Sequence, residues 1–343
     1  MTAKRRPSRV WPAAAAIAGT LAVALPTAAT EPRFPVVDLH VDLPYQVVHR
    51  ERGLAEGTGQ FRAADLLRAG VVGVVLPLFV PATVAPGGPQ AEHYEASLGR
   101  MVDLLPKTRP YVPRACGVAP GEVATFFSFE GAPHLARAPE STAAWVERGV
   151  RVVGLVHARD NALASSSGEP EPSERGLTER GREVIERAYA AGAIVDVSHM
   201  SDRATADAIA LAQRLGRPIL ATHSNARARA AHPRNLRDED ARGIAATGGV
   251  VGVNFHGPFV ARGRPARLAD VVGHIRHLVR VAGEDHVAIG SDFEGGIRPP
   301  AGLRDATGYP RLARALLAAG MSEELVRKVF AGNALRVLCP PAP

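Results

Sequence analysis

The sequence predicts a single (β/α)8 barrel of the TIM type. Eight short apolar runs occur along the chain, and longer amphipathic segments separate them. The 343 residues are enough for one such barrel, which needs about 250. Strands that alternate with helices in this way form a parallel sheet covered by helices. The apolar runs are residues 36–41, 71–79, 124–129, 152–156, 194–197, 219–221, 250–255 and 287–289.

The segments between and after these runs have apolar residues at helical spacing. The last of them begins at Ser322, a typical N-cap residue, with Glu323 and Glu324 in the first turn. His274 and His277 lie on a helix face that we expect to be solvated. The predicted helices are residues 63–69, 91–105, 141–148, 178–191, 202–215, 238–246, 268–281, 310–319 and 322–338.

The N-terminal residues 1–29 have the three parts of a secretory signal: a basic start, an alanine-rich apolar stretch and small residues before the expected cleavage after Ala29. The alternative is an uncleaved anchor that holds the protein at a membrane. The predicted domains are this segment, a barrel domain over 30–339 and a disordered tail over 340–343. We therefore expect an exported protein, periplasmic, secreted or associated with the cell envelope. Cys116 and Cys339 are the only cysteines, and the sequence leaves their pairing open.

The composition argues against a nucleic-acid partner. Of 41 basic residues 38 are arginine, and these are scattered among acidic residues instead of forming a basic stripe. Residues 1–30 hold four basic residues and no acid, so without them the net charge falls from +7 to +3. The oligomeric state, a homodimer included, stays open.

The end of the first apolar run carries three ionisable residues, Asp38, His40 and Asp42. Residues two apart on a strand share a face, so these three are expected to face one way and the apolar residues among them the other way. We expect His40 and Asp42 to hold a divalent metal ion and Asp38 to support them. The alternative is an ordinary polar strand end.

Residues of the same kinds recur after other apolar runs. A lone histidine in this position is commonly structural, but parallel strands of a barrel end at one mouth. The recurrence therefore favours one shared site for metal binding and proton transfer. These residues are Glu130, His157, His199, His223 and Asp292.

The donor types at this mouth suit two zinc-like ions. Three histidines and two carboxylates, with no free thiolate in reach, can hold two such ions when one carboxylate is shared. None of the three lysines of the chain ends a strand, which excludes a carbamylated lysine as the bridge. Glu130 is the expected bridge, since Gly131 leaves room for its carboxylate to face both ions.

Taken together, the motifs resemble the membrane (renal) dipeptidases, peptidase family M19 of the metal-dependent amidohydrolase barrels. The likeness extends from about residue 36 to 337, and the loops 158–177 and 256–259 depart from it. Both loops are expected to border the substrate pocket, so the side-chain preference stays open. The matching segments are residues 38–44, 129–131, 156–157, 196–201, 222–224, 233–235, 253–255, 290–295 and 332–337.

The resemblance implies two bound zinc ions. His40 and Asp42 should hold one ion, His199 and His223 the other, and Glu130 should bridge both. A hydroxide between the ions would then be the nucleophile.

The resemblance also implies roles in substrate binding and catalysis. Asp292 should transfer protons, His157 should donate to the developing oxyanion, and Arg234 should bind the free carboxylate of a dipeptide. The implied reaction is hydrolysis of dipeptides, including those with a D-residue at the C-terminal position. Hydrolysis of a lactam, lactone or non-peptide amide at the same metals is the enzymatic alternative. A catalytically silent metal- or ligand-binding protein is the other, although Asp292 would have no function in it.

Overall fold

The computed structural model describes residues 34–54, 59–81, 91–113, 116–171 and 175–340. The predicted signal or anchor segment, and the predicted tail beyond Pro340, lie outside these ranges. Within the described part of the chain, no helix is long and apolar enough to cross a membrane.

Eight parallel strands close into a barrel, because β1 pairs with β2 and β9 and because β2 also pairs with β4. Every one of the eight predicted apolar runs overlaps a strand of this barrel, which confirms the predicted fold. The runs are nearly all Val, Ile, Leu and Phe because both faces of each strand are buried. The strands are β1 Val36–Asp38, β2 Val71–Leu78, β4 Val123–Glu130, β5 Val150–Gly154, β6 Ile194–Asp196, β7 Ile219–Ala221, β8 Val250–Val253 and β9 Val287–Ile289.

A ninth strand, β3 (Tyr111–Pro113), was not predicted. It pairs with the first three residues of β4, and β5 pairs with the last four on the same side. Because β3 has only three residues and ends in a proline, the sequence carries little sign of it.

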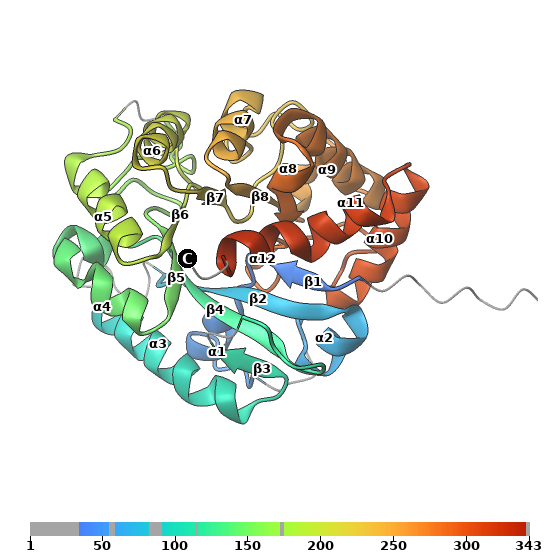
Figure 1. The fold of residues 1–343 in the computed structure, drawn as a ribbon, viewed down its shortest axis with the longest axis horizontal. Coiled ribbons are helices and arrows are strands. Elements are labelled where there is room, and N and C mark those ends of the chain that lie inside the picture. Colours follow the sequence, from blue (N-terminus) through green and yellow to red (C-terminus); the bar gives the residue numbers. More distant parts are fainter. Residues whose placement is uncertain (1–33, 55–58, 82–90, 114–115, 172–174, 341–343) are drawn as a thin grey trace, which may run out of the picture. The chain divides into compact units, whose positions relative to one another are not determined.

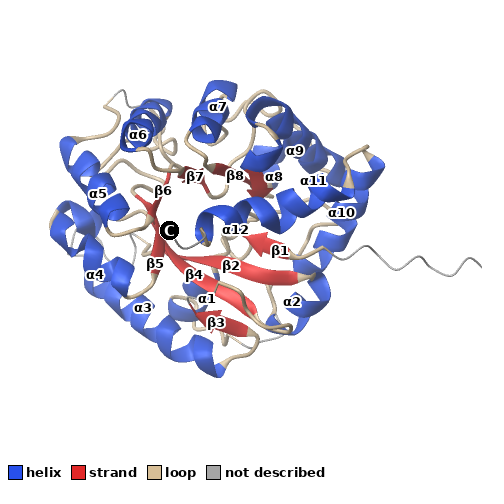
Figure 2. Cartoon of the chain, viewed as in Figure 1, coloured by secondary structure: helices blue, strands red, loops and turns tan. Residues whose placement is uncertain are grey.

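Helices surround the strands (Figures 1 and 2). Two of them, α1 and α8, were missed because each is short and has a proline in its first turn, which hides the helical period. The stretch predicted as one helix over 322–338 is divided by a π-helical turn, Lys328–Gly332. The helices are α1 Leu43–Val48, α2 Ala63–Ala69, α3 Ala91–Leu104, α4 Thr142–Glu147, α5 Glu179–Ala190, α6 Asp202–Leu215, α7 Asp238–Ala246, α8 Gly257–Val260, α9 Leu268–Ala282, α10 Tyr309–Ala318, α11 Glu323–Arg327 and α12 Asn333–Leu338.

Side-chain hydroxyls cap several helices at their N-termini. Ser322 accepts a hydrogen bond from Leu325 N (3.1 Å), as predicted for an N-cap. Ser201 does the same for Ala204 N (3.1 Å) at the start of α6. Ser201 lies two residues after His199, so this cap holds the backbone that follows a predicted site residue in place.

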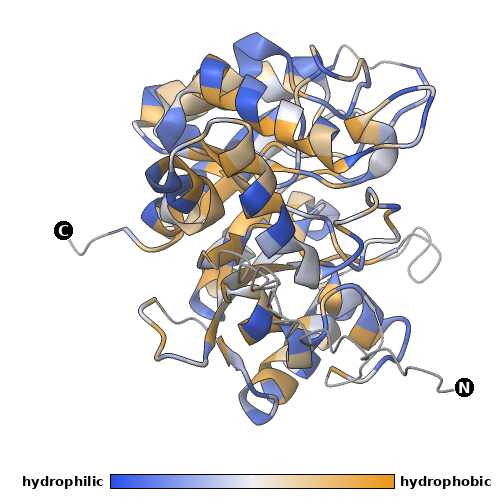
Figure 3. Cartoon of the chain, turned by 90° about the vertical axis from the view of Figure 1, so that its right-hand side faces the viewer, coloured by the Kyte–Doolittle hydropathy of each residue, from blue (hydrophilic) through white to orange (hydrophobic). Residues whose placement is uncertain are grey.

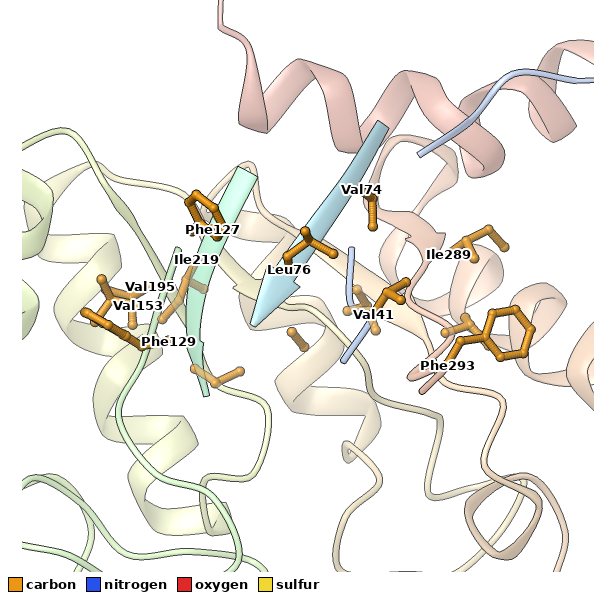
Figure 4. Close-up of a cluster of buried hydrophobic side chains, with 14 of the residues drawn as sticks. Val41, Val74, Leu76, Phe127, Phe129, Val153, Val195, Ile219, Ile289 and Phe293 are labelled. Atoms are coloured by element: carbon orange, nitrogen blue, oxygen red, sulfur yellow. The ribbon is translucent and has the colours of Figure 1, made fainter. Parts of the chain in front are cut away.

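Apolar side chains pack on both faces of the barrel wall. Outward-facing residues such as Val74, Leu76 and Phe127 pack beneath the helices (Figure 4). Their neighbours Val75 and Phe126 face the barrel interior. Apolar residues accordingly gather along the strands and inner helix faces, and hydrophilic ones on the outer helix faces (Figure 3).

The interior core also contains residues of α12, namely Ala334, Val337 and Leu338. This helix packs against β1, β8 and β9. Apolar residues therefore fill the inside of the barrel, and the predicted site residues follow the carboxyl ends of its strands.

The predicted alternation of residues 37–42 is wrong after Leu39. Val37 and Leu39 pack inside the barrel, but Val41 belongs to the outer core. The reason is that β1 ends at Asp38, so the period of two ends there too. Asp38 accepts hydrogen bonds from His40 N (3.1 Å) and from the Tyr309 hydroxyl.

His274 and His277 are buried, contrary to the expectation of solvated side chains. His274 Nδ1 accepts from Ala226 N (3.2 Å), and its Nε2 donates to Val260 O (3.0 Å). These bonds join α9 to the loop after β7 and to α8. Burial lowers the pKa of His274 to about 4, in keeping with a neutral ring that both donates and accepts.

Cys116 and Cys339 form a disulfide across 223 residues of sequence. The bond joins the segment between β3 and β4 to the end of α12. The pairing that the sequence left open is thus present in the structure.

Candidate metal centre

Apart from Arg234, which lies in the loop between β7 and α7, each predicted site residue stands at or just beyond the carboxyl end of its strand. Glu130 is the last residue of β4. His40 and His223 stand two residues beyond β1 and β7, and His199 and Asp292 three residues beyond β6 and β9. Because all these strands are parallel, their ends bring the side chains together at one mouth.

The carboxylate of Glu130 lies at the centre of this group. Its Oε1 is 3.0 Å from His199 Nε2, 3.4 Å from both His40 Nε2 and His223 Nε2, and 3.8 Å from His157 Nε2. Four imidazoles from four different strands therefore face one carboxylate oxygen. The sequence predicted these residues to share a mouth, and the structure brings them into contact.

Asp42 and Asp292 flank the same group. Asp42 Oδ2 is 3.7 Å from His40 Nε2. Asp292 has a positive φ of 67° and accepts a hydrogen bond from Asn254 Nδ2 (2.9 Å), which holds its side chain in place. A Cβ at Gly295 would stand 2.5 Å from Asp42 Oδ2 and 2.7 Å from Asp292 Oδ1, so only glycine leaves room for both carboxylates.

The three carboxyl groups differ in their electrostatics. Burial acts to raise the pKa of Glu130, but the imidazoles of His157 and His40 and hydrogen bonds from other histidines outweigh it and hold the pKa well below its ordinary range. Burial and repulsion by Glu130 raise the pKa of Asp42 well above its ordinary range. Burial is also the main cause that raises the pKa of Asp292 to about 6.

Burial, assisted by neighbouring positive charge, holds the pKa of His199 and of His223 well below its ordinary value. Neutral imidazoles offer a nitrogen lone pair, which is what a metal ion needs. Repulsion between buried carboxylates is what a cation relieves. The electrostatics of the mouth therefore suit divalent metal ions.

One atom points to metal binding directly. His40 Nε2 is buried and makes no hydrogen bond with any described residue. A buried polar nitrogen without a partner is costly, and a metal ion at this position would satisfy it. Three sets of possible ligands have their donor atoms within 4.8 Å of one another. They are His40, Asp42 and Glu130; Glu130, His157 and His199; and His40, His223 and Asp292.

A cavity of about 600 Å³ opens onto this centre. Asp42, Glu130, His157, His199, Arg234 and Asp292 line it. Its other walls are formed by residues that the sequence analysis did not single out, including Tyr45, Gln46, Arg50, Phe79 and Ile297. The predicted border loop 256–259 contributes His256 and Phe259. Four residues of the other predicted border loop line a second cavity of about 450 Å³, namely Ser166, Ser167, Glu169 and Pro170.

The family model for membrane dipeptidase, peptidase family M19, matches residues 28–340. The chain belongs to the membrane dipeptidase family. Members are metal-dependent hydrolases, which makes this chain a metallo-dipeptidase, and the mouth described above holds its candidate metal-ligand clusters.

Three relatives illustrate this membership. A dipeptidase of Claviceps purpurea is 32% identical over 220 residues, which cover 64% of this chain and 51% of that protein, so the chain matches about half of its length. The solved structure of dipeptidase AC, an M19 metallopeptidase, is 29% identical with a TM-score of 0.80. The match covers 90% of this chain and 98% of that one. A metallopeptidase of Rhodobacter sphaeroides, solved with a phosphinate mimic of the dipeptide L-Ala-D-Ala, is 27% identical with a TM-score of 0.78. The match covers 90% of this chain and 99% of that one.

Arg234 is closer to the histidines than the sequence suggested. Its side chain is buried, its Nε donates to His199 Nδ1 (3.1 Å), and its Nη2 donates to His223 Nε2 (2.7 Å). An Nε2 lone pair that accepts from arginine cannot bind a metal ion at the same time. A metal ion on His223 therefore requires the guanidinium to turn away, and the cavity that Arg234 lines is the space beside it.

The cavity residues that the sequence did not predict lie on segments without a conspicuous histidine or acid. Tyr45 and Gln46 lie on α1, and Arg50 follows it shortly after. Phe79 directly follows β2, where no histidine or acid drew attention. A clue was present, because a chain segment that directly follows the candidate ligand Asp42 cannot be far from the site.

Proposed function

We propose that this chain is a zinc-dependent dipeptidase that holds two metal ions at the barrel mouth. The observation that carries the proposal is Glu130 Oε1, which faces four imidazole nitrogens at 3.0–3.8 Å. We assign His40 and Asp42 to one ion, His199 and His223 to the other, and Glu130 to both. When bound, such ions lower the pKa of a water molecule and polarise the scissile carbonyl.

Asp292 is the proposed proton-transfer group. It would accept a proton from the attacking water and deliver it to the departing amine. Its buried carboxyl has a pKa of about 6, closer to neutrality than an ordinary aspartate, and Asn254 orients it. These properties support a role in which the group both gains and loses a proton.

His157 and Arg234 are the proposed substrate-binding residues. Burial lowers the pKa of His157, so its ring is neutral and can donate a hydrogen bond to the scissile carbonyl oxygen, where negative charge develops. Arg234 has a planar set of donors that matches a carboxylate. We propose that it exchanges its contact with His223 for the free carboxylate of the dipeptide.

The comparisons support a dipeptide substrate. The fungal relative is named a dipeptidase, and the bacterial structure carries a mimic of L-Ala-D-Ala. We therefore propose that this chain accepts dipeptides with a D-residue at the C-terminal position. A cavity of about 600 Å³ is within the usual range for small ligands.

We also propose export from the cytoplasm. The disulfide between Cys116 and Cys339 supports this, since such bonds persist in oxidising compartments. Mass spectrometry of the mature protein tests it. A mature N-terminus at Thr30 is expected, and an intact N-terminus in the cytoplasmic fraction would contradict export.

The test of function is a set of four substrates: L-Ala-L-Ala, L-Ala-D-Ala and the C-terminal amide of each. Zinc-loaded protein is expected to hydrolyse both free acids, to act poorly on the amides, and to lose activity when a chelator removes the metal. Equal rates on acids and amides would favour a general amide hydrolase instead. No hydrolysis of any dipeptide by metal-loaded protein would contradict the proposal.

A further inference from the structure

The hydroxyl of Thr222 occupies an unusual position behind the metal centre. The residue follows β7, directly before His223, and is fully buried. Its Oγ1 lies 2.5 Å from Asp196 Oδ2, 2.9 Å from His223 Nδ1 and 3.2 Å from His40 Nδ1. One hydroxyl thus contacts two histidines that we assign to different metal ions.

The hydrogen positions follow from counting donors and acceptors. A carboxylate only accepts, and Asp196 Oδ1 already accepts from Ser198 N and Thr222 N at 2.9 Å each. The Thr222 hydroxyl therefore donates its single proton to Asp196 Oδ2. Its two lone pairs remain, and they can only accept N–H bonds from His223 Nδ1 and His40 Nδ1. Ser198 Oγ is farther away, at 3.4 Å.

This arrangement determines the tautomer of both rings. An imidazole that is protonated at Nδ1 and neutral has its lone pair on Nε2. The two rings are stacked with centroids 3.7 Å apart, and both Nε2 atoms lie 3.4 Å from Glu130 Oε1. Both lone pairs are therefore directed to the place where metal ions are expected.

His199 provides a contrast within the same centre. Its Nδ1 accepts from Arg234 Nε, so its proton is on Nε2 and points to Glu130 or His223. The tautomer of His40 and His223 is thus a local effect of Thr222 and Asp196, and not a property of every histidine at the mouth.

We propose that Thr222, held by Asp196, is a positioning residue that sets the metal-binding tautomer of His40 and His223 together and so couples the two metal sites. The inference rests on the proposed two-metal centre. Because one hydroxyl serves both rings, its removal weakens both sites at once. Groups that orient metal-binding histidines in this way typically change metal affinity about 10–100-fold.

The first test needs no bound metal and no substitution. Long-range ¹H–¹⁵N correlation spectra of the metal-free full-length protein report which ring nitrogen of each histidine carries the proton. We expect His40 and His223 protonated at Nδ1, and His199 at Nε2. A neutral ring at His40 or His223 that carries its proton on Nε2 and not on Nδ1 would overturn the inference.

The second test compares zinc affinity among variants by competition with a chelator. Thr222→Val keeps the shape and loses the hydroxyl, and Thr222→Ser keeps the hydroxyl. We expect zinc binding about 10–100-fold weaker at both sites for Thr222→Val, and near the starting affinity for Thr222→Ser. Thr125→Val is the matched control, since Thr125 is equally buried and its hydroxyl donates to Val123 O. It should bind zinc like the starting protein.

Asp196→Asn tests the other half of the pair. Its amide NH₂ would donate to Thr222 Oγ1 and turn the threonine proton toward one imidazole, which would then be protonated at Nε2. We expect the spectra to show this change at His40 or His223, together with weaker zinc binding.

The outcomes separate this inference from the proposed function. Unchanged zinc affinity in Thr222→Val, or equal losses in Thr222→Val and Thr222→Ser, would overturn the role of the hydroxyl while leaving the metal centre in place. His40→Ala, measured in the same competition, checks the centre itself. Unchanged zinc binding in His40→Ala would remove the proposed centre, and the inference with it.

Discussion

Substitution of Gly295 by alanine tests how closely the carboxylates of the mouth are packed. Ordinary van der Waals contact begins near 3.4 Å, and the added Cβ would stand 2.5 Å from Asp42 Oδ2 and 2.7 Å from Asp292 Oδ1. To restore ordinary contact with the new Cβ, the carboxylate of Asp42 must move by about 0.9 Å and that of Asp292 by about 0.7 Å. Gly295 is outside the left-handed region, so alanine fits its backbone. A displacement of about 1 Å at reacting groups costs roughly 10²-fold in rate.

We thus expect Gly295→Ala to lower kcat/KM for a dipeptide about 100-fold, or about 2.7 kcal/mol, with little change in Tm. Steady-state kinetics, zinc content and thermal unfolding measure the three quantities. Gly216→Ala is the control: Gly216 has a φ of +62° at the end of α6, and its Cβ would meet nothing within 4 Å. That variant should lose about 1–2 kcal/mol of stability and keep its activity. A Gly295→Ala enzyme with normal kcat/KM, or one that merely unfolds, would refute the reasoning.

Four further predictions concern the centre and its surroundings. Elemental analysis should show that Glu130→Gln weakens both metal sites together and that His40→Ala weakens mainly one. Full metal occupancy in Glu130→Gln would exclude Glu130 as the residue that bridges the two ions. Asp292→Asn should keep fold and metal but lose about 10²–10⁴-fold in kcat, and a near-normal kcat would assign proton transfer elsewhere. Arg234→Ala should lower kcat/KM for a dipeptide about 10–100-fold and scarcely affect its C-terminal amide, so equal effects on both would refute a carboxylate contact. Buried His134 has no hydrogen-bond partner on either ring nitrogen among the described residues, and burial lowers its pKa from 6.5 to about 3. The unfolded chain therefore binds this proton first, so stability that is present above about pH 6.5 is lost as the pH falls. At pH 5 the free energy of unfolding should be lower by about 2 kcal/mol, as measured by urea unfolding of the metal-free protein. His134→Phe should not show this loss.

The sequence predicted the barrel well because its physical causes are local and repeated. Every barrel strand is buried on both faces, so each appears as an apolar run without needing knowledge of its partners. The elements that were not predicted, such as the helices α1 and α8 and the strand β3, are only a few residues long. The break in alternation after Leu39 could not be read either, since the period of a strand does not show where the strand ends.

The sequence predicted which residues gather at the mouth, but not the contacts that they make there. His40, Glu130 and His223 stood out because histidines and acids are conspicuous after apolar runs. Thr222 and Asp196 belonged to matching segments but received no role, since a threonine and an aspartate at strand ends usually cap a helix or contact solvent. Their role depends on distances between β1, β6 and β7, which no local pattern contains. The contact of Arg234 with two histidines arises from tertiary structure in the same way.

The central claim is that Glu130 and its surrounding histidines form a two-metal hydrolytic centre. The most direct measurement is a zinc titration of metal-free protein in which bound zinc and hydrolysis of L-Ala-D-Ala are followed in the same samples. The account predicts binding that ends at two zinc ions per chain, with full activity reached only at the second. A plateau at one ion with full activity, or two bound ions with no dipeptide hydrolysis, would contradict it.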